Sequence, residues 1–290
     1  MLYIFLFVLL ILLLHIGIAY FVANKIVNAN INNELVDQEK YNALDFSNFT
    51  KNDFLMYSKD NYPLQGIHFT QSNSKGLVIL CHGFSVSYFT VASRGKAFLE
   101  LGYDILLYNH VHFNHKNGRK CGMGGFESDD LELIVQHFKT QYSNIVAYGL
   151  SMGAATVLMH SGKYSSAGRY IAESSYLSVK AQIESRIIAN FHFAMPVYPF
   201  IRLWIKFLGG YDTDTIQVGK TAANSTAPIL LMHGEADDYI PYCQSKEIEK
   251  LCPMVQELHI IQGAAHVGCF EVDPIHYKHV LQQFLSTATM

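Results

Sequence analysis

The stretch "AYGLSMGAAT", residues 147–156, holds one serine between two glycines in a G-x-S-x-G spacing. An apolar run at 144–149 precedes Ser151, and a run typical of a helix follows it at 152–162. At such a strand-to-helix junction the turn is sharp, and the flanking glycines leave room for neighbouring backbone. The spacing therefore predicts that Ser151 is a nucleophile held above the end of a buried strand. The alternative is a serine in an ordinary tight bend.

Apolar strand-like runs alternate with helical patterns on both sides of this junction. A period-two pattern around a turn at 53–71 predicts a β-hairpin before them. The expected buried strands lie at residues 75–83, 103–110, 144–149, 169–174, 227–234 and 255–263. Strands that alternate with helices form βαβ units, so the pattern predicts a mostly parallel central sheet flanked by helices.

The segment at about 175–225 interrupts this alternation and is rich in aromatic residues. We expect a helical insertion there that acts as a cap over the sheet. Its aromatic side chains are candidates for an apolar substrate pocket, with packing against the sheet as the alternative. They are Phe191, Phe193, Tyr198, Phe200 and Trp204. A third option is that the insertion touches the bilayer and lets lipid-like acyl chains enter.

The N-terminus has a different composition from the rest of the chain. Residues 1–23 are almost uninterruptedly apolar, which is enough for a helix to span a bilayer. No Lys or Arg precedes the run, which disfavours a cleaved signal peptide, and a helix with no polar face is a poor core helix. We expect a transmembrane anchor at 1–23, a polar juxtamembrane linker at 24–52 and the enzyme-like domain at 53–290.

Composition excludes several classes of function. The 290 residues are 50% hydrophobic with a net charge of −3, and the basic residues are scattered, so nucleic acid is not an expected partner. The five cysteines include no C-x-x-C pair, which indicates neither a zinc site nor a disulfide framework. His110, His112 and His115 cluster without a supporting Asp, Glu or Cys pattern. We therefore expect no metal and no organic cofactor.

A nucleophilic serine needs a base, and the base needs an orienting acid. In a fold of this kind both follow the serine, the acid first and the histidine second. "LLMHGEADDYIP" supplies Asp237 at the end of an expected strand, with Glu235 and Asp238 as competitors. "IIQGAAHVGCF" supplies His266 after the next strand. The predicted catalytic residues are therefore Ser151, Asp237 and His266.

The oxyanion formed during attack on an acyl carbonyl needs two N–H donors. One expected donor is the backbone N–H of Met152, directly after the nucleophile. The other is the N–H of Phe84, in the loop that follows "VILCHG" and is shaped by His82 and Gly83. The alternative for this loop is an ordinary strand-ending turn, because "MHG" recurs at 232–234.

Together "CHGF", "GLSMG", "HGEADDYIP" and "GAAH" resemble the α/β-hydrolase family over residues 53–288. The resemblance implies a Ser-His-Asp hydrolase that works through an acyl-enzyme. "CGMGGFESDDLELIV" resembles the G-x-x-E-x-x-D-L segment of a membrane-anchored bacterial branch that contains serine aminopeptidases and esterases. The chain departs from that branch at 109–120, where "NHVHFNHKNGRK" lacks the usual D-x-R-x-H-G-x-S pattern.

The expected function is hydrolysis of carboxylic esters with small or lipid-like acyl groups. An aminopeptidase-like peptidase is an alternative, and it would need acidic side chains near the substrate amine, for which Glu127 and Glu173 are candidates. Thioesterase or acyltransferase chemistry and a non-enzymatic binding protein are further alternatives. The expected partners are the acyl substrate and, through the N-terminal helix, a membrane.

Membrane orientation has two conflicting indications. Lys25 follows the apolar run, which favours a cytoplasmic domain by the positive-inside rule. Members of the branch that the chain resembles face the cell exterior. We follow the resemblance and expect a single-pass membrane protein with an extracellular catalytic domain.

Overall fold

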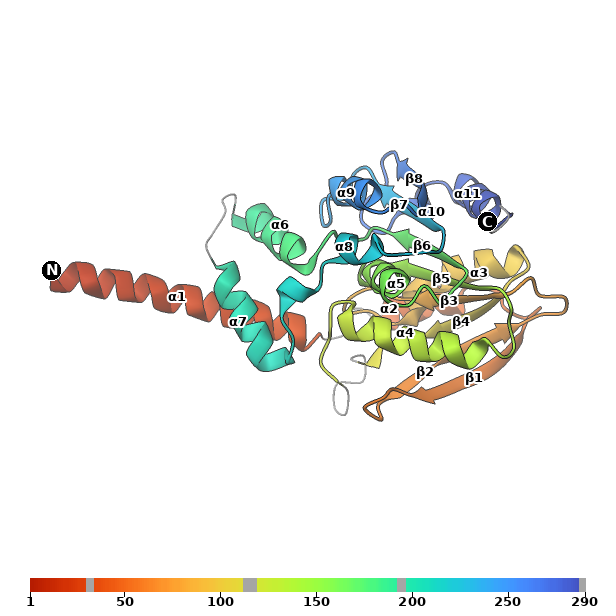
Figure 1. Cartoon of the computed structure of the whole chain (residues 1–290), viewed down its shortest axis with the longest axis horizontal. Coiled ribbons are helices and arrows are strands. Elements are labelled where there is room, and N and C mark those ends of the chain that lie inside the picture. The colour runs from red at the N-terminus through yellow and green to blue at the C-terminus, as the bar shows by residue number, and fades with distance from the viewer. Residues whose placement is uncertain (30–33, 112–118, 192–196, 287–290) are drawn as a thin grey trace.

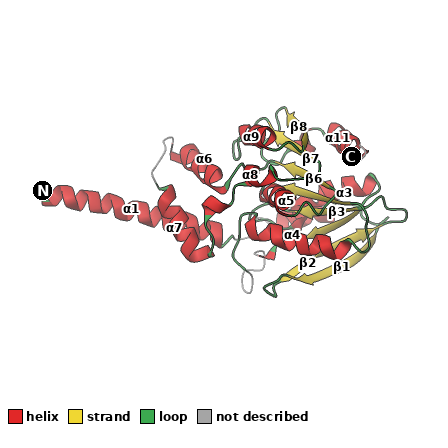
Figure 2. Cartoon of the chain, in the orientation of Figure 1, coloured by secondary structure: helices red, strands yellow, loops and turns green. Residues whose placement is uncertain are grey.

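A single eight-stranded sheet with helices on both faces forms the centre of the protein (Figures 1 and 2). The computed structural model describes residues 1–29, 34–111, 119–191 and 197–286. The strands are β1 (Thr50–Tyr57), β2 (Pro63–Thr70), β3 (Leu77–Cys81), β4 (Asp104–Tyr108), β5 (Ile145–Leu150), β6 (Arg169–Glu173), β7 (Ile229–Gly234) and β8 (Val255–Ile261).

The strand order across the sheet is β1-β2-β4-β3-β5-β6-β7-β8. β2 runs antiparallel to both β1 and β4, and every neighbouring pair from β4 to β8 is parallel. Strands β3 to β7 are buried along their whole length, because helices cover both faces of a parallel sheet. The predicted hairpin and mostly parallel sheet are therefore confirmed.

Two hydrophobic cores lie on opposite faces of the sheet, because successive side chains of a strand point in opposite directions. Leu77 and Ile79 of β3 face one core, and Val78 and Leu80 face the other. The first core is covered by α4 (Gly125–Phe138), α5 (Met152–Lys163), α8 (Val218–Ala222) and α9 (Cys243–Leu251). The second is covered by α3 (Ala92–Glu100), α10 (Cys269–Val272) and α11 (Pro274–Ser286).

Helix α1 (Leu2–Val27) projects from the domain and is long and apolar enough to cross a membrane, with a mean hydropathy of 2.8. Its 26 residues span about 39 Å, more than the hydrocarbon core of a bilayer. It continues past the expected boundary at residue 23. Its C-terminal part packs along α7 (Tyr198–Gly209), as Figure 1 shows.

The remaining helices come from the segment between β6 and β7 and from the segment ahead of β1. The segment at 175–225 contains α6 (Val179–Phe191), α7, the short 3₁₀ helix η3 (Thr213–Thr215) and α8. Of these, α8 packs directly on α5, whereas α6 and α7 flank α1 (Figure 1). Within the segment expected to be a linker, α2 (Glu34–Asn42) lies over the 3₁₀ helix η1 (Tyr88–Val91).

The turn between β5 and α5 is closely packed against neighbouring backbone. A β-carbon built on Gly149 would lie 2.1 Å from the carbonyl oxygen of Gly153. A β-carbon on Gly153 would lie 2.0 Å from the carbonyl oxygen of Cys81. Neither position accepts a side chain, so both glycines are needed for α5 to start where it does.

Gly153→Ala is expected to destabilise the protein by at least about 1–3 kcal/mol, because the new methyl group overlaps the Cys81 carbonyl. Urea unfolding in detergent measures the change. Gly168→Ala is the matched control, since its β-carbon would meet its nearest neighbour at an ordinary 3.5 Å. Equal unfolding midpoints for the two variants would contradict the close-packing argument.

Candidate active site

Ser151 occupies the sharp turn between β5 and α5. Its backbone has φ 57° and ψ −114°, a left-handed conformation that is rare for a residue with a side chain. Its N–H donates to the carbonyl of Glu173 at 2.8 Å, and its carbonyl accepts from the N–H of Ala155. Neighbouring backbone thus holds the turn in this conformation. Ser151 therefore lies on a strained strand-to-helix turn and not in an ordinary bend.

The structure brings Ser151, His266 and Asp237 into one chain of hydrogen bonds. Nε2 of His266 lies 3.0 Å from Oγ of Ser151, and Nδ1 lies 2.7 Å from Oδ2 of Asp237. Asp237 follows β7 and His266 follows β8, so both come from the carboxyl edge of the parallel sheet, where such sites form. The competing carboxylates Glu235 and Asp238 are exposed, and it is Asp237 that meets Nδ1 of His266.

Asp237 is held as a carboxylate by several donors. Oδ1 accepts the backbone N–H groups of Tyr239 and Ile240 at 3.0 and 2.8 Å. Nε2 of the buried His233 lies 3.2 Å from Oδ2 and also donates to the carbonyl of Ile240. Burial alone would raise the pKa of Asp237, but the hydrogen bonds from His233 and His266 outweigh it and hold the pKa well below its usual range. No sequence motif singled out His233.

A buried ion pair supports the loop that carries His266. Val267, the next residue, has φ 54°, which is a strained conformation for a β-branched residue. Nη2 of Arg94 donates to the Val267 carbonyl at 2.6 Å and lies 3.3 Å from Oε1 of Glu173. The N–H of Val267 reaches Oγ of Ser174 at 3.4 Å. No sequence motif pointed to Arg94, because its partners lie far away along the chain.

The loop after β3 passes directly against the serine. A β-carbon built on Gly83 would lie 3.5 Å from Cβ of Ser151. Nε2 of His82 accepts the N–H of His110 at 3.0 Å, so Nδ1 carries the proton and donates to the Gly83 carbonyl at 2.8 Å. Phe84 follows in this loop, and Met152 begins α5, where the first N–H groups have no partner within the helix.

A cavity of about 430 Å³ opens beside Ser151. Most of its lining is apolar and comes from the loop after β3, the start of α5, helix α6 and the C-terminal part of α1. Besides Ser151 and the residues of α1 and α6, the lining consists of Phe84, Met123, Met152, Tyr176, Tyr239 and Ile240. From α6 the cavity receives Gln182, Ile183, Arg186, Ile187 and Asn190.

Several aromatic residues were expected to line the pocket. Those whose side chains the structure describes lie away from the cavity. The hydroxyl of Tyr198 bonds to Thr213 and Asp214, and the Trp204 ring packs edge-on against Tyr20 of α1, with ring centroids 5.1 Å apart. Neither contributes to the cavity wall, because α7 turns these side chains toward η3 and α1. The side chain of Phe191 and all of Phe193 lie outside the described part of the chain, as do His112 and His115.

A second cavity, of about 460 Å³, opens on the His266 side of the site. It lies between α2 and the start of α3, and its lining is more polar. The charged side chains among its lining residues are Asp37, Lys40, Arg94 and Glu271. The Ser151–His266 hydrogen bond thus lies between an apolar cavity and a polar one.

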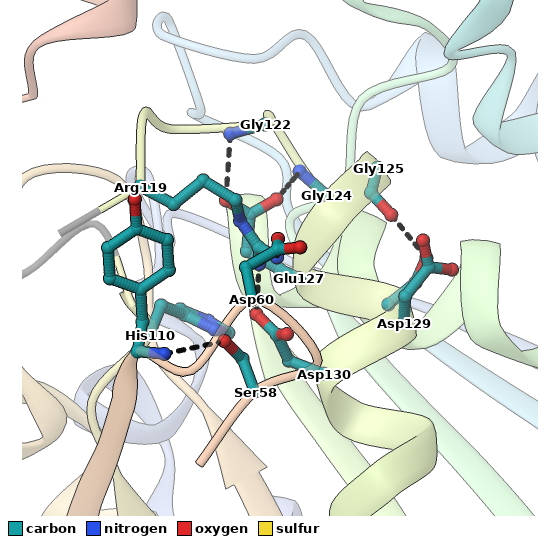
Figure 3. A network of polar contacts seen from close by, with 12 residues as sticks. Ser58, Asp60, His110, Arg119, Gly122, Gly124, Gly125, Glu127, Asp129 and Asp130 are labelled. Carbon is teal, nitrogen blue, oxygen red and sulfur yellow. Dashed lines mark hydrogen bonds and ion pairs between the residues drawn. The ribbon is translucent and has the colours of Figure 1, made fainter.

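Glu127 organises the loop before α4 (Figure 3). Its two carboxylate oxygens accept the N–H groups of Gly122 and Gly124, each at 2.8 Å. Between these glycines stands Met123, which lines the apolar cavity and whose carbonyl accepts the Tyr176 hydroxyl at 3.0 Å. The carboxylate of Glu127 therefore shapes the cavity wall from behind and is not directed at a substrate.

Comparison with known proteins agrees with this fold. The profile of the serine aminopeptidase S33 family matches residues 72–215. The YqkD protein of Bacillus subtilis, which is uncharacterized, is 25% identical over 280 residues, covering 93% of this chain and 92% of YqkD.

The chain has the α/β-hydrolase fold.

Two solved esterases share the hydrolase fold. An esterase from Pyrococcus furiosus superposes with a TM-score of 0.68 at 20% identity, covering 83% of this hydrolase and 92% of the esterase. Acetyl xylan esterase from Paenibacillus sp. R4 superposes with a TM-score of 0.64 at 14% identity, covering 87% and 92% of the two chains. At these identities the likeness establishes the fold.

The depressed pKa of Asp237 predicts a pH-dependent contribution to the stability of the hydrolase. The carboxylate stabilises the folded state above its unfolded pKa of about 3.9, and this stabilisation is lost as pH falls toward the lower folded pKa. Asp237→Asn removes the titrating group. The difference in unfolding free energy between wild type and variant should therefore shrink as pH falls below about 4.

Urea unfolding at pH 7, 4 and 3 checks this expectation. Asp238→Asn is the control, because Asp238 is the exposed neighbour of Asp237. A difference between wild type and Asp237→Asn that stays constant over this pH range would contradict the assigned electrostatics.

Proposed function

We propose that this hydrolase cleaves carboxylic esters with apolar acyl chains, with Ser151 as nucleophile, His266 as base and Asp237 as orienting acid. The observation that carries the proposal is the unbroken hydrogen-bond chain from Asp237 to Oγ of Ser151 at the mouth of an apolar cavity. The same three residue types in this arrangement activate serine in hydrolases on several folds.

In the first step, Nε2 of His266 accepts the proton of Ser151 as Oγ attacks the acyl carbonyl. Asp237 keeps the proton of His266 on Nδ1 and stabilises the imidazolium that forms. The N–H groups of Phe84 and Met152 receive the oxyanion, and the dipole of α5 adds positive potential at its N-terminus. Water then attacks the acyl-enzyme with His266 again as base, which releases the acid.

The two cavities suggest where each half of the ester binds. The leaving oxygen takes its proton from Nε2 of His266, so the alcohol must leave on the histidine side. That side opens on the polar cavity with Lys40 and Glu271. The acyl chain then occupies the apolar cavity, whose lining includes Phe84 and Met152. The arrangement favours an apolar acyl group and a polar alcohol.

An aminopeptidase is less well supported because the two candidate acids are already bound. Glu173 is fully buried, pairs with Arg94 and accepts the hydroxyls of Tyr148 and Tyr277 at 2.7 and 2.8 Å. Glu127 accepts two backbone N–H groups. None of the described residues that line the apolar cavity is acidic, so a substrate ammonium group would find no carboxylate there.

Hydrolysis of p-nitrophenyl esters from acetyl to palmitoyl by the full-length protein in detergent tests the proposal. Ser151→Ala should lower kcat by about 10³–10⁶, because removal of the nucleophile leaves only oxyanion stabilisation and binding. Ser286→Ala, an exposed serine at the end of α11, is the matched control and should keep the wild-type rate. Wild-type turnover by Ser151→Ala would refute the assignment.

The same preparations distinguish an esterase from an aminopeptidase. The ester should be hydrolysed far faster than alanine p-nitroanilide, because the cavity offers no anionic partner for the substrate amine. A Ser151-dependent preference for the anilide would reverse this conclusion.

A further inference from the structure

The membrane-type helix α1 forms one wall of the cavity that contains Ser151. Val22, Lys25 and Ile26 line the cavity together with Ile183 and Ile187 of α6. The apolar side chains of α1 and α6 thus line the same space. A helix whose only role is to tether a domain has no reason to supply side chains to the active site.

This part of α1 is built into the hydrolase domain. Ala19, Ala23 and Val27 are fully or almost fully buried, and they recur every four residues on one face of the helix. The N–H of Cys121 donates to the Val27 carbonyl at 3.1 Å. A β-carbon on Gly209 of α7 would lie 3.0 Å from a methyl group of Val27. The cavity wall is therefore fixed in place.

The rest of α1 and the outer face of α7 leave large apolar side chains exposed. Every residue from Leu2 to Leu14 is apolar and exposed. On α7, which packs along α1, Leu203 and Phe207 are 64% and 78% exposed. Exposed apolar surface of this extent beside a helix that can cross a bilayer fits contact with lipid. The cavity-lining residues Val22, Lys25 and Ile26 follow this exposed part along α1.

We propose that α1 is part of the substrate-binding site and that the substrate is an acyl ester resident in the membrane, drawn into the cavity along α1. This inference rests on the proposed esterase function. The acyl chain passes from lipid into the space between α1 and α6, so it stays in apolar surroundings on its way to Ser151. Lys25 is exposed at this level, and a long charged side chain there is suited to the head-group layer of a bilayer.

The selectivity of the full-length protein for acyl chain length tests whether α1 forms a wall of the substrate-binding cavity. Val22→Trp and Ile26→Trp add bulk to the cavity, and Leu14→Trp places the same residue on the exposed part of α1. In the two cavity variants the ratio of kcat/KM for the palmitoyl ester to that for the acetyl ester should fall by about tenfold or more. Leu14→Trp should keep the wild-type ratio.

Labelling of Ser151 by a fluorophosphonate probe shows whether each variant is folded. Labelled variants with an unchanged ratio would overturn the role of α1. Wild-type protein that labels but hydrolyses no ester would instead overturn the proposed function, so the two failures are distinguishable.

Reconstitution tests the source of the substrate. The hydrolase in phosphatidylcholine vesicles is given a fluorescent long-chain acyl ester either in the same bilayer or bound to albumin in the surrounding buffer. At equal total ester and early times, hydrolysis should be about tenfold faster from the same bilayer, because encounter is then confined to the membrane. Equal rates, or faster hydrolysis from albumin, would overturn the membrane source.

Discussion

The close approach of α5 to the end of β3 is the constraint on which the site depends. The backbone at Gly153 comes so near to the Cys81 carbonyl that no side chain fits between them. The same approach brings the loop of Gly83, in which Phe84 follows, against Ser151. The strained turn at Ser151 and the loop that carries Phe84 thus meet at one packing contact between backbone segments.

Several buried charged side chains of this protein hold loops in position. Arg94 and Glu173 hold the loop of His266, while Glu127 folds the loop that carries Met123 into the cavity wall (Figure 3). His82 and His233 do the same for the loop after β3 and for Asp237. A buried ion or imidazole needs several fixed partners, and these partners are backbone groups of otherwise irregular segments. The polar groups around the site therefore account for its rigidity.

The N-terminal segments contribute to the site and do not serve only as a tether for the domain. Helix α1 contributes to the apolar cavity and α2 to the polar one, so residues ahead of the sheet line the cavities on both sides of the Ser151–His266 pair. The polar composition of 24–52 is typical of a linker, but Tyr41 packs its ring 5.0 Å from that of Phe89. Composition alone did not reveal this docking, because the partner surface comes from a distant part of the chain.

The sequence by itself determined the order of strands and helices, the sharp turn at Ser151 and the acid and histidine to look for. Each of these depends on local patterns: period-two and period-four spacing of apolar residues, glycines beside a serine, and a polar residue after a strand. The tertiary structure alone decided what surrounds them. It turned Tyr198 and Trp204 away from the cavity, placed Val22 and Ile26 in its wall and set Arg94 behind His266. Such contacts join residues far apart in the chain, and their formation depends on how whole helices pack.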